Sequence, residues 1–497
     1  MPRMTRRAMR LGMLVVGAAA VTACTLGPDP ERPVTAAQTA DAFVHQSPAA
    51  DRPAVDAWWE GFGDAHTAKL VRLALERNTD LQGAVARVLE AEASLRRASG
   101  ARWPQVDYSG TASRQKTSFV LPDIGRRSVY STTLNADLGV SYVVDLFGKL
   151  KRTQQTAWAS LLAEEAAAEA VQHAVVAQVV RARVQTATLE RGLEITRGIR
   201  ASWERTLATT ERRYRSGLAT AVDLYLAREN LSSAQAAEVA FAAGLEQARH
   251  ALDVLVGRRP GTGPPLPGTL AELPDLEPIP AGLPAELLDR RPDLRQAEAQ
   301  LAAATYGVGI ALADLYPSLT LTGSFGVTAD SLSDLVSSET VVYNAVAGLV
   351  GPLFTGGQRR AEVEAARARV DQATAAYAGA VLNALREVED ALVASTSTVE
   401  QLEFTRRRVE EARSADRLAR QRYQRGVDTL LQVLETERRL RNAEEALLNI
   451  KAAVWNARID LYLALGGDWA PVSGTPGPPA ATDAIARADI PTNQTPG

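Results

Sequence analysis

Two stretches of the chain repeat apolar residues in alternating steps of three and four, the spacing of a helix that packs against another helix. The first stretch consists of Val381, Leu385, Val388, Leu392, Ser395, Val399 and Leu402. The second stretch consists of Leu440, Ala443, Leu447, Ile450, Val454, Ala457 and Leu461. Gly426, Val427 and Asp428 lie between the two and have the character of a turn. The pattern predicts an antiparallel helical hairpin.

Long helices form in segments without proline, and residues 123–259 and 353–470 contain no proline. In the first of these regions we predict a helix from Lys149 to Ser216, about 65 residues and roughly 100 Å long. Two shorter helices, about His66 to Arg102 and about Thr220 to Val256, together match that length. We expect the shorter helices to stack end to end along the long one.

Elsewhere the pattern changes to a period of two. Every second residue from Tyr130 to Leu146 is mostly apolar while the intervening residues are mostly polar, and residues 318–328 repeat this alternation. Such strands are typical of an outer-membrane barrel, with Tyr130 and Tyr142 far enough apart to mark the two membrane interfaces. A half-buried antiparallel sheet that covers a water-soluble core has the same period and stays open as an alternative.

The chain also contains the same plan twice. Asn78 to Gly110 aligns without a gap to Arg291 to Gly323, and the pattern Arg-Tyr-x-x-Gly-x-x-Thr occurs at residues 213–220 and at 422–429. This spacing indicates a tandem duplication. Each copy would supply two strands, so one chain has four, and strand edges left unpaired in lipid would be very costly. Closure therefore requires several chains, and either eight strands from two chains or twelve from three would satisfy it.

The N-terminus has the organisation of an export signal. Arg3, Arg6, Arg7 and Arg10 are followed by the apolar residues 11–20 and by Val21-Thr22-Ala23-Cys24. This start resembles a bacterial lipoprotein signal with its lipobox, which implies cleavage before Cys24 and acylation of that cysteine. An ordinary secretory signal with an incidental cysteine is the alternative, and Thr5-Arg6-Arg7 loosely resembles a twin-arginine signal.

The composition of the chain mainly argues against other kinds of site and partner. Of the 497 residues 46% are hydrophobic and 5% aromatic, the four histidines lack ligand spacing, and Cys24 is the single cysteine. Without residues 1–23 the chain keeps 51 basic and 58 acidic side chains, a balance that does not favour nucleic-acid binding. After the signal no stretch has eighteen uninterrupted apolar residues, so a helical membrane span is not expected.

Catalytic patterns are also missing from the sequence. No nucleophile has a neighbouring base, and Gly356-Gly357 lacks the lysine of a phosphate-binding loop, so we interpret this pair as a turn. Residues 387–390, Glu-Val-Glu-Asp, could suggest a metal site, but a solvated flank of the heptad pattern explains them better. We expect no enzyme activity, no metal and no cofactor apart from a covalent lipid on Cys24.

Six segments in order resemble TolC-type outer-membrane factors, most closely the lipoproteins of RND efflux systems called the NodT family. They are WWEGFGD at Trp58, DLFGKLKR at Asp145, GLPAELLDRRPDLRQAE at Gly282, YPSLTLTGSFG at Tyr316, GPLFTGG at Gly351 and NALREVEDAL at Asn383. The resemblance covers Cys24 to about Gly466. The chain departs from the family at Pro30, where a tyrosine is common, and at Val143, where an acidic residue is usual.

The resemblance implies a fold class that is mainly α with membrane β, built from a duplicated unit of helix, two strands, long helix and helix. Three chains would form a twelve-stranded β-barrel continued by a periplasmic α-helical barrel. The expected organisation is a signal peptide at 1–23, an N-terminal lipidated extended segment at 24–63, a first repeat at 64–256 with a β-hairpin at 104–147 and a long helical hairpin at 149–256, a proline-rich equatorial linker at 257–292, a second repeat at 293–466 with a β-hairpin at 317–354 and a long helical hairpin at 358–466, and a disordered C-terminal tail at 467–497.

The implied function is that of the exit duct of a tripartite efflux pump, which passively conducts drugs or other small molecules through the outer membrane. Its partners would be two further copies of the chain, a periplasmic adaptor protein, an inner-membrane RND pump and outer-membrane lipid, without nucleic acid. By similarity the periplasmic gate candidates are Glu435, Arg438, Asp223 and Tyr423. The candidates for docking the adaptor are the matched turns Gly217-Leu218 and Gly426-Val427.

Two other functions remain open from the residues. A periplasmic coiled-coil scaffold lipoprotein would explain the heptads but not the strands, and a duct of a protein-secretion system would share the whole architecture. All four methionines lie in the signal, which disfavours a thioether path for copper or silver.

Overall fold

The structure is a computed structural model that describes residues 25–40, 42–45, 58–121, 125–264, 266, 284–334 and 340–467. The expected signal peptide, Cys24 and nearly all of the expected tail lie outside these residues. The chain divides into two compact units. The first comprises residues up to 33, 87–164 and 296–377, and the second comprises 34–86, 165–295 and 378 onward.

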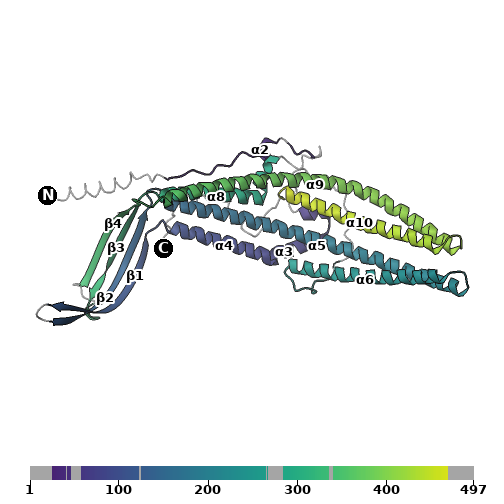
Figure 1. Cartoon of the computed structure of the whole chain (residues 1–497), viewed down its shortest axis with the longest axis horizontal. Coiled ribbons are helices and arrows are strands. Elements are labelled where there is room, and N and C mark those ends of the chain that lie inside the picture. Colours follow the sequence, from purple (N-terminus) through teal and green to yellow (C-terminus); the bar gives the residue numbers. More distant parts are fainter. Residues whose placement is uncertain are drawn as a thin grey trace, which may run out of the picture. The chain divides into compact units, whose positions relative to one another are not determined.

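The elements follow one another in the order of a duplicated plan (Figure 1). The helices are α2 (Ala36–Thr39), η1 (Trp58–Phe62), α3 (Ala65–Arg77), α4 (Thr79–Gly100), α5 (Lys149–Arg215), α6 (Ala221–Leu255), η2 (Pro284–Glu286), α7 (Leu287–Arg290), α8 (Pro292–Ala313), α9 (Gln358–Gln424) and α10 (Leu430–Ala464). The strands are β1 (Gln105–Leu121), β2 (Gly125–Val144), β3 (Ser318–Ala329) and β4 (Val341–Val350). In both copies a 67-residue helix is followed by a 35-residue helix.

The first unit holds one antiparallel sheet with the strand order β1-β2-β3-β4. β2 and β3, which come from different copies, pair from Leu134 opposite Ala329 to Val144 opposite Leu319. The β1–β2 hairpin is longer than β3 and β4 and reaches beyond their ends (Figure 1). Four strands per chain is therefore the number that the duplication predicts.

The register separates the sheet into an apolar and a mostly polar face. Opposite partners lie on the same face, so one row across the four strands consists of Tyr108, Leu138, Phe325 and Tyr343. These four side chains are 53% to 88% exposed. Within the described residues, this row of the apolar face is therefore open to the surroundings of the chain. The polar face is interrupted on β4 by Val342, Val346 and Val350.

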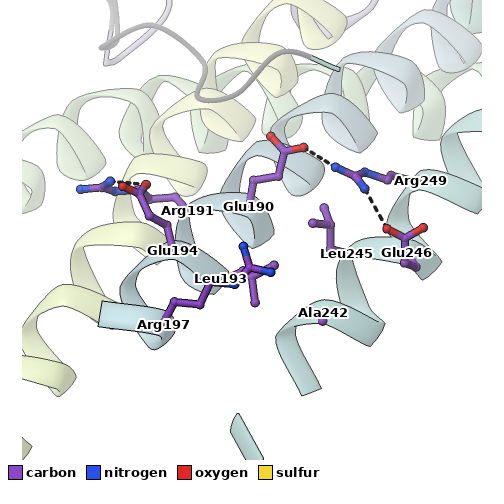
Figure 2. A pocket seen from close by; sticks show the side chains of 9 residues that line it. All are labelled: Glu190, Arg191, Leu193, Glu194, Arg197, Ala242, Leu245, Glu246 and Arg249. Carbon is purple, nitrogen blue, oxygen red and sulfur yellow. Dashed lines mark hydrogen bonds and ion pairs between the residues drawn. The ribbon is translucent and has the colours of Figure 1, made fainter. Parts of the chain in front are cut away.

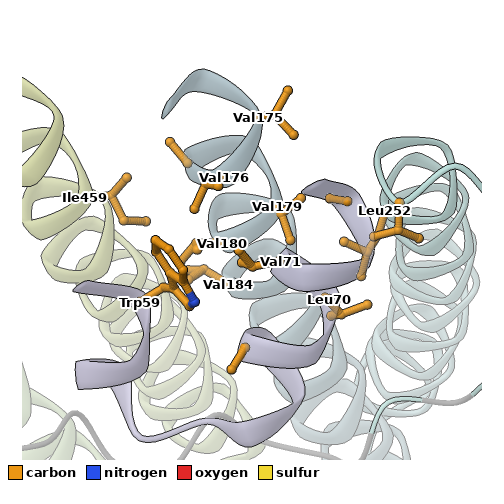
Figure 3. Packing of buried hydrophobic residues seen from close by; sticks show 14 of the residues in the cluster. Trp59, Leu70, Val71, Val175, Val176, Val179, Val180, Val184, Leu252 and Ile459 are labelled. Carbon is orange, nitrogen blue, oxygen red and sulfur yellow. The ribbon is translucent and has the colours of Figure 1, made fainter. Parts of the chain in front are cut away.

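The core of the second unit gathers helices from both copies. Valines of α5 form its centre, and α3, α6, α10 and η1 pack against them (Figure 3). The residues drawn and labelled are Trp59, Leu70, Val71, Val175, Val176, Val179, Val180, Val184, Leu252 and Ile459. β-branched side chains are stiff and fill this seam with little loss of rotamer freedom. The valine cluster of α5 thus holds helices of both copies in one core.

The helix predicted from His66 to Arg102 is interrupted, which corrects the prediction. Asn78 separates α3 from α4 because its Oδ1 accepts hydrogen bonds from the amides of Asp80 and Leu81, at 2.9 and 3.1 Å. The Nδ2 of Asn78 also donates to the carbonyl oxygen of Leu255 at 2.9 Å. The last turn of α6 is therefore tied to the start of α4, as the expected end-to-end stacking requires.

The second copy repeats this junction with different chemistry. Arg291, the counterpart of Asn78, donates from Nη1 to the carbonyl oxygen of Ala464 in the last turn of α10 at 3.1 Å. It also binds Asp293 and Glu387, each at 2.7 Å. In both copies the last helix of the repeat, α6 or α10, thus ends against the start of α4 or α8.

Within the described residues no helix is long and apolar enough to cross a membrane.

Candidate functional site

Both long helical hairpins turn at a glycine in the left-handed region. Gly217 has a φ of +69° and Gly426 a φ of +78°. The amide of Leu218 donates to the carbonyl five residues earlier at 2.8 Å, and that of Val427 does the same at 3.0 Å, which is the closure of a Schellman motif. A Cβ at either glycine would meet nothing within 4 Å, so the glycines serve the turn and no close approach within the chain.

The two turns expose one aliphatic side chain each. Leu218 is 70% and Val427 is 62% exposed. The turns therefore present matched apolar tips, and their expected role in docking an adaptor stays a prediction.

Tyr423 lies between the two hairpins. It is 7% exposed, and its hydroxyl is 3.3 Å from Oγ1 of Thr210 on α5. The guanidinium of Arg213 lies over the ring, 4.8 Å from its centroid, and its Nη1 donates to the carbonyl of Tyr423 at 2.9 Å. Ala419, Leu430 and Val433 complete this small core. Tyr423 thus joins α9 to α5 within one chain.

Glu435 and Arg438 lie together on one helix, α10. Nη2 of Arg438 is 2.8 Å from Oε2 of Glu435, and Nε of Arg439 is 2.7 Å from Oε1. Hydrogen bonds from Arg438 and Arg439 lower the pKa of Glu435. These are bonds between one turn and the next, so within the chain the expected gate pair does not connect two helices.

Asp223 caps the helix on which it lies. Its Oδ2 accepts hydrogen bonds from the amide and the hydroxyl of Thr220, at 2.9 and 2.8 Å, and Oγ1 of Thr220 accepts from the amide of Asp223 at 3.2 Å. This reciprocal pair is a capping box at the start of α6. The structure therefore gives Asp223 a local role besides the expected one at the gate.

A buried charged cluster near the same end was not predicted from the sequence. Arg420 on α9 donates to Asp416 at 2.8 Å and to Glu437 on α10 at 2.6 Å, and its Nη1 is 3.4 Å from Oγ1 of Thr206 on α5. Burial raises the pKa of Glu437 to about 7, against the opposing effect of Arg420. The available signal was that Asp416 lies seven residues after the buried Val409, on the helix face that forms the seam.

Tyr130 and Tyr142 lie on the apolar face of β2. Tyr130 is 60% exposed, and Lys116 and Arg114 lie 5.3 and 5.8 Å from its ring centroid. Tyr142, opposite Leu321, is partly buried. Their placement twelve residues apart on one face matches the expected pair of interface aromatics, whose role stays a prediction.

The segment that follows Cys24 is bound in a specific site of the first unit. Arg152, which is 2% exposed, donates to the carbonyl oxygens of Leu26 and Gly27 and to Asp29, at 3.0, 2.8 and 2.7 Å. The ring of Tyr306 lies 5.4 Å from its guanidinium carbon. Sequence reasoning missed this site because its partners are more than 120 residues apart in the chain.

Small residues let this segment approach closely. A Cβ at Gly27, whose φ is +91°, would lie 2.4 Å from Cα of Gly309, and a Cβ at Gly148 would lie 2.9 Å from Thr25. Further along, Arg32 makes a bidentate pair with Glu298 at 2.7 and 2.8 Å. Residues 25–32 are therefore held at several points against α5 and α8.

In the second unit the surface between α5 and α6 is hollowed into an open groove of about 490 Å³ (Figure 2). Leu193, Ala242 and Leu245 form its apolar part, and ion pairs such as Glu190 with Arg249 at 2.9 Å rim it. Each pair drawn joins opposite charges, although Oε2 of Glu190 and Nε of Arg249 have no hydrogen-bond partner among the described residues, and the groove has the character of a polar helix surface.

The acidic run at residues 387–390 does not gather into a metal site. Glu387 binds Arg291, Asp390 binds Arg386 at 2.8 Å, and Glu389 accepts hydrogen bonds from the amides of Val44 and His45, at 2.6 and 3.1 Å. Among the described residues no group of three histidine, cysteine or acidic side chains could hold a metal ion.

The family model "Outer membrane efflux protein" matches residues 70–258 and 283–467 of the chain, one segment for each copy of the duplication. The outer membrane protein OprJ of Pseudomonas aeruginosa is 34% identical over 452 residues, covering 90% of this chain and 93% of OprJ. The solvent efflux pump outer membrane protein SrpC of Pseudomonas putida is 32% identical over 410 residues, covering 82% and 87%. The chain belongs to the outer membrane efflux protein family.

The fold agrees with that assignment. The solved outer-membrane channel OprN superimposes with a TM-score of 0.80 at 31% identity, covering 90% of this chain and 100% of that one. The fold class expected from the sequence is confirmed, and the family consists of channels. This chain is an outer-membrane channel of an efflux system.

Proposed function

We propose that three copies of the chain close into a twelve-stranded barrel and form the exit duct of an RND-type tripartite pump, which conducts small molecules without catalysis. The supporting observation is the four-stranded sheet. In the part of the chain that the structure describes, β1 and β4 each pair on one side only, and the apolar face is exposed. Lipid tolerates neither unpaired edges nor a monomer of this kind, so the edges pair between chains.

The test is a planar-bilayer recording on the purified full-length oligomer, with its mass measured in parallel. A trimer that opens steady ion-conducting pores is the expected result. A monomer, or a protein that binds lipid without conducting, would instead support the coiled-coil scaffold.

The hairpin ends support a division of labour at the periplasmic aperture. Tyr423 joins the two hairpins inside each chain, whereas Arg438 is exposed and Glu435 half-buried at the chain surface. We assign the pair Glu435 and Arg438 to contacts with the neighbouring chain that keep the aperture closed, with Tyr423 and Asp223 supporting them from within. The tips Leu218 and Val427 would meet the periplasmic adaptor, behind which the inner-membrane pump lies.

The gate is tested by replacing one glutamate at a time on α10. Glu435→Ala should raise the single-channel conductance because it removes the acceptor of the bridge, whereas Glu445→Ala, further along the same helix, should not. Equal conductance of wild type and Glu435→Ala over a range of salt concentrations would remove Glu435 from the gate.

We also propose that Cys24 carries the covalent lipid. The supporting observation is the site formed by Arg152, Gly148 and Gly309, which fixes the chain from Thr25 onward. A lipid on the preceding residue would thereby be held beside the start of α5. Mass spectrometry of the mature N-terminal peptide decides this, and an unmodified Cys24 or a cleavage elsewhere would contradict it.

A further inference from the structure

The apolar face of the sheet changes character where β3 ends. Leu134 on β2 is opposite Ala329, the last residue of β3, and beyond it only the β1–β2 hairpin continues. The next residues on the same face of β2 are Thr132 and Tyr130, whose partners on β1 are Arg114 and Lys116. The face is therefore apolar up to Leu134 and cationic directly after it.

The two cations are arranged around one ring. Lys116 and Arg114 lie 5.3 and 5.8 Å from the ring centroid of Tyr130, and all three side chains are exposed. Contact with the ring holds the cations on the outward face and leaves their donors free to bind anions. Residues 112–121 and 125–134 contain no acidic side chain, and Asp123 is the one acidic residue between them in the sequence.

The height of this cluster corresponds to a lipid headgroup layer. A strand rises about 3.3 Å per residue and tilts about 40° in a membrane barrel, so Thr132 and Tyr130 lie roughly 5 and 10 Å above Leu134. The headgroup region on each side of the hydrocarbon core is roughly 5 to 8 Å thick, so Thr132 lies within it and Tyr130 at its outer edge. Because β1 and β2 join the helices at their other ends, the cluster lies at the outer surface of the membrane.

We propose that Arg114, Lys116 and Tyr130 form a binding site for the phosphate groups of the glycolipid that makes up the outer leaflet. Arg114 supplies a planar fork of donors that suits a phosphate, Lys116 supplies a second positive charge, and the ring of Tyr130 holds both cations on the outward face. The site goes beyond conduction: it fixes the hairpin in the lipid layer and needs only the outer-membrane location of the sheet.

Native mass spectrometry of the intact full-length oligomer tests the site with lipid A as the probe. Wild-type protein should retain doubly phosphorylated lipid A more strongly than the same lipid after removal of its phosphates. Arg114→Gln/Lys116→Gln should weaken binding of the phosphorylated form by roughly 30-fold, since each cation near a charged membrane surface contributes about a factor of five. Arg114→Lys, which keeps the charge, should retain most of the binding.

The matched control removes the same charge from the same hairpin. Arg126, paired with Val120, is on the same face but four residues beyond Tyr130, and Arg127, paired with Phe119, is on the other face. Arg126→Gln/Arg127→Gln should bind lipid A like the wild type. Equal losses of binding in both double variants would show diffuse charge attraction and no specific site. Equal retention of phosphorylated and dephosphorylated lipid A by the wild type would also overturn the proposal. Bilayer conductance of all variants separates this result from a failure of the channel.

Discussion

The two helical hairpins carry the same turn motif in different surroundings. Tyr214 and Tyr423 hold the same place in the repeated Arg-Tyr-x-x-Gly-x-x-Thr pattern, yet Tyr214 is 44% exposed and Tyr423 is 7% exposed. Their preceding arginines differ as well: Arg213 stacks on Tyr423 of the other hairpin, whereas Arg422 pairs with Asp428 of its own turn at 2.8 Å. Duplication therefore conserved the local turn, while packing assigned the joining role to one copy only.

The glycines at the two ends of each hairpin also differ in their surroundings. The glycines at the tips, Gly217 and Gly426, would meet nothing with an added Cβ. Gly257 and Gly466, where α6 and α10 end, are also left-handed but lie against the backbone of Arg77 and Arg290. Conformation alone requires glycine at the tips, whereas conformation and contact both require it at the other end.

The largest expected effect comes from an added methyl group at these glycines. In Gly257→Ala a Cβ would lie 2.6 Å from the carbonyl oxygen of Arg77, so both the positive φ and the overlap oppose folding. We expect a loss of about 4 kcal/mol, against about 1 kcal/mol for Gly217→Ala, where only the φ is strained. Denaturant unfolding of the two variants measures the difference. Equal losses would show that the contact at Gly257 adds nothing.

Truncating the two tyrosines tests which copy joins the hairpins. Tyr423→Ala should destabilise by about 3 kcal/mol because it empties a buried site that includes the contacts of Thr210 and Arg213. Tyr214→Ala should cost roughly 0.5 kcal/mol, as is usual for an exposed position. Thermal unfolding and hydrogen exchange at the tips measure both. A larger loss for Tyr214→Ala would reverse the assignment.

The buried cluster of Arg420, Asp416 and Glu437 makes the second hairpin sensitive to pH. Because burial raises the pKa of Glu437 from 4.5 to about 7, the folded chain binds the proton more tightly than the unfolded chain. Its contribution is therefore complete below pH 4.5 and is lost as the pH rises through about 7, by up to roughly 3 kcal/mol. Glu437→Gln should flatten this part of the stability curve.

Hydrogen exchange at the hairpin tips, measured at several pH values, gives the free energy of local opening as a function of pH. The informative quantity is the difference in the free energy of opening between the wild type and Glu437→Gln, since other carboxylates titrate in both proteins. A difference that grows in favour of the wild type as the pH rises would contradict the direction.

The smallest expected effect distinguishes the starts of α6 and α10. Thr220 takes part in a capping box with Asp223, whereas its counterpart Thr429 makes no side-chain capping hydrogen bond. Thr220→Ala should therefore cost about 1 kcal/mol and Thr429→Ala only a few tenths. Matched denaturant curves of the two variants decide between this expectation and equal capping at both starts.

Much of the candidate site was accessible from the sequence because it depends on local chemistry. The hairpin turns follow from glycines in a repeated motif, and the interface tyrosines follow from the period of two. The roles of Tyr423 and Arg420 were not accessible, because their partners on α5 lie more than 200 residues away in the chain. The site of Arg152 is of the same kind, since two short segments with no shared pattern meet there.

The amino-acid sequence by itself determined the long helices and the strands. The helix predicted from Lys149 to Ser216 corresponds to α5, which ends at Arg215, because no proline interrupts the backbone hydrogen bonds of this stretch. Tertiary structure alone decided that the first helix breaks at Asn78, whose side-chain amide donates a hydrogen bond to the carbonyl oxygen of the distant Leu255. It also decided which of two equivalent tyrosines is buried, because exposure depends on what lies opposite a residue and not on its own neighbours in the chain.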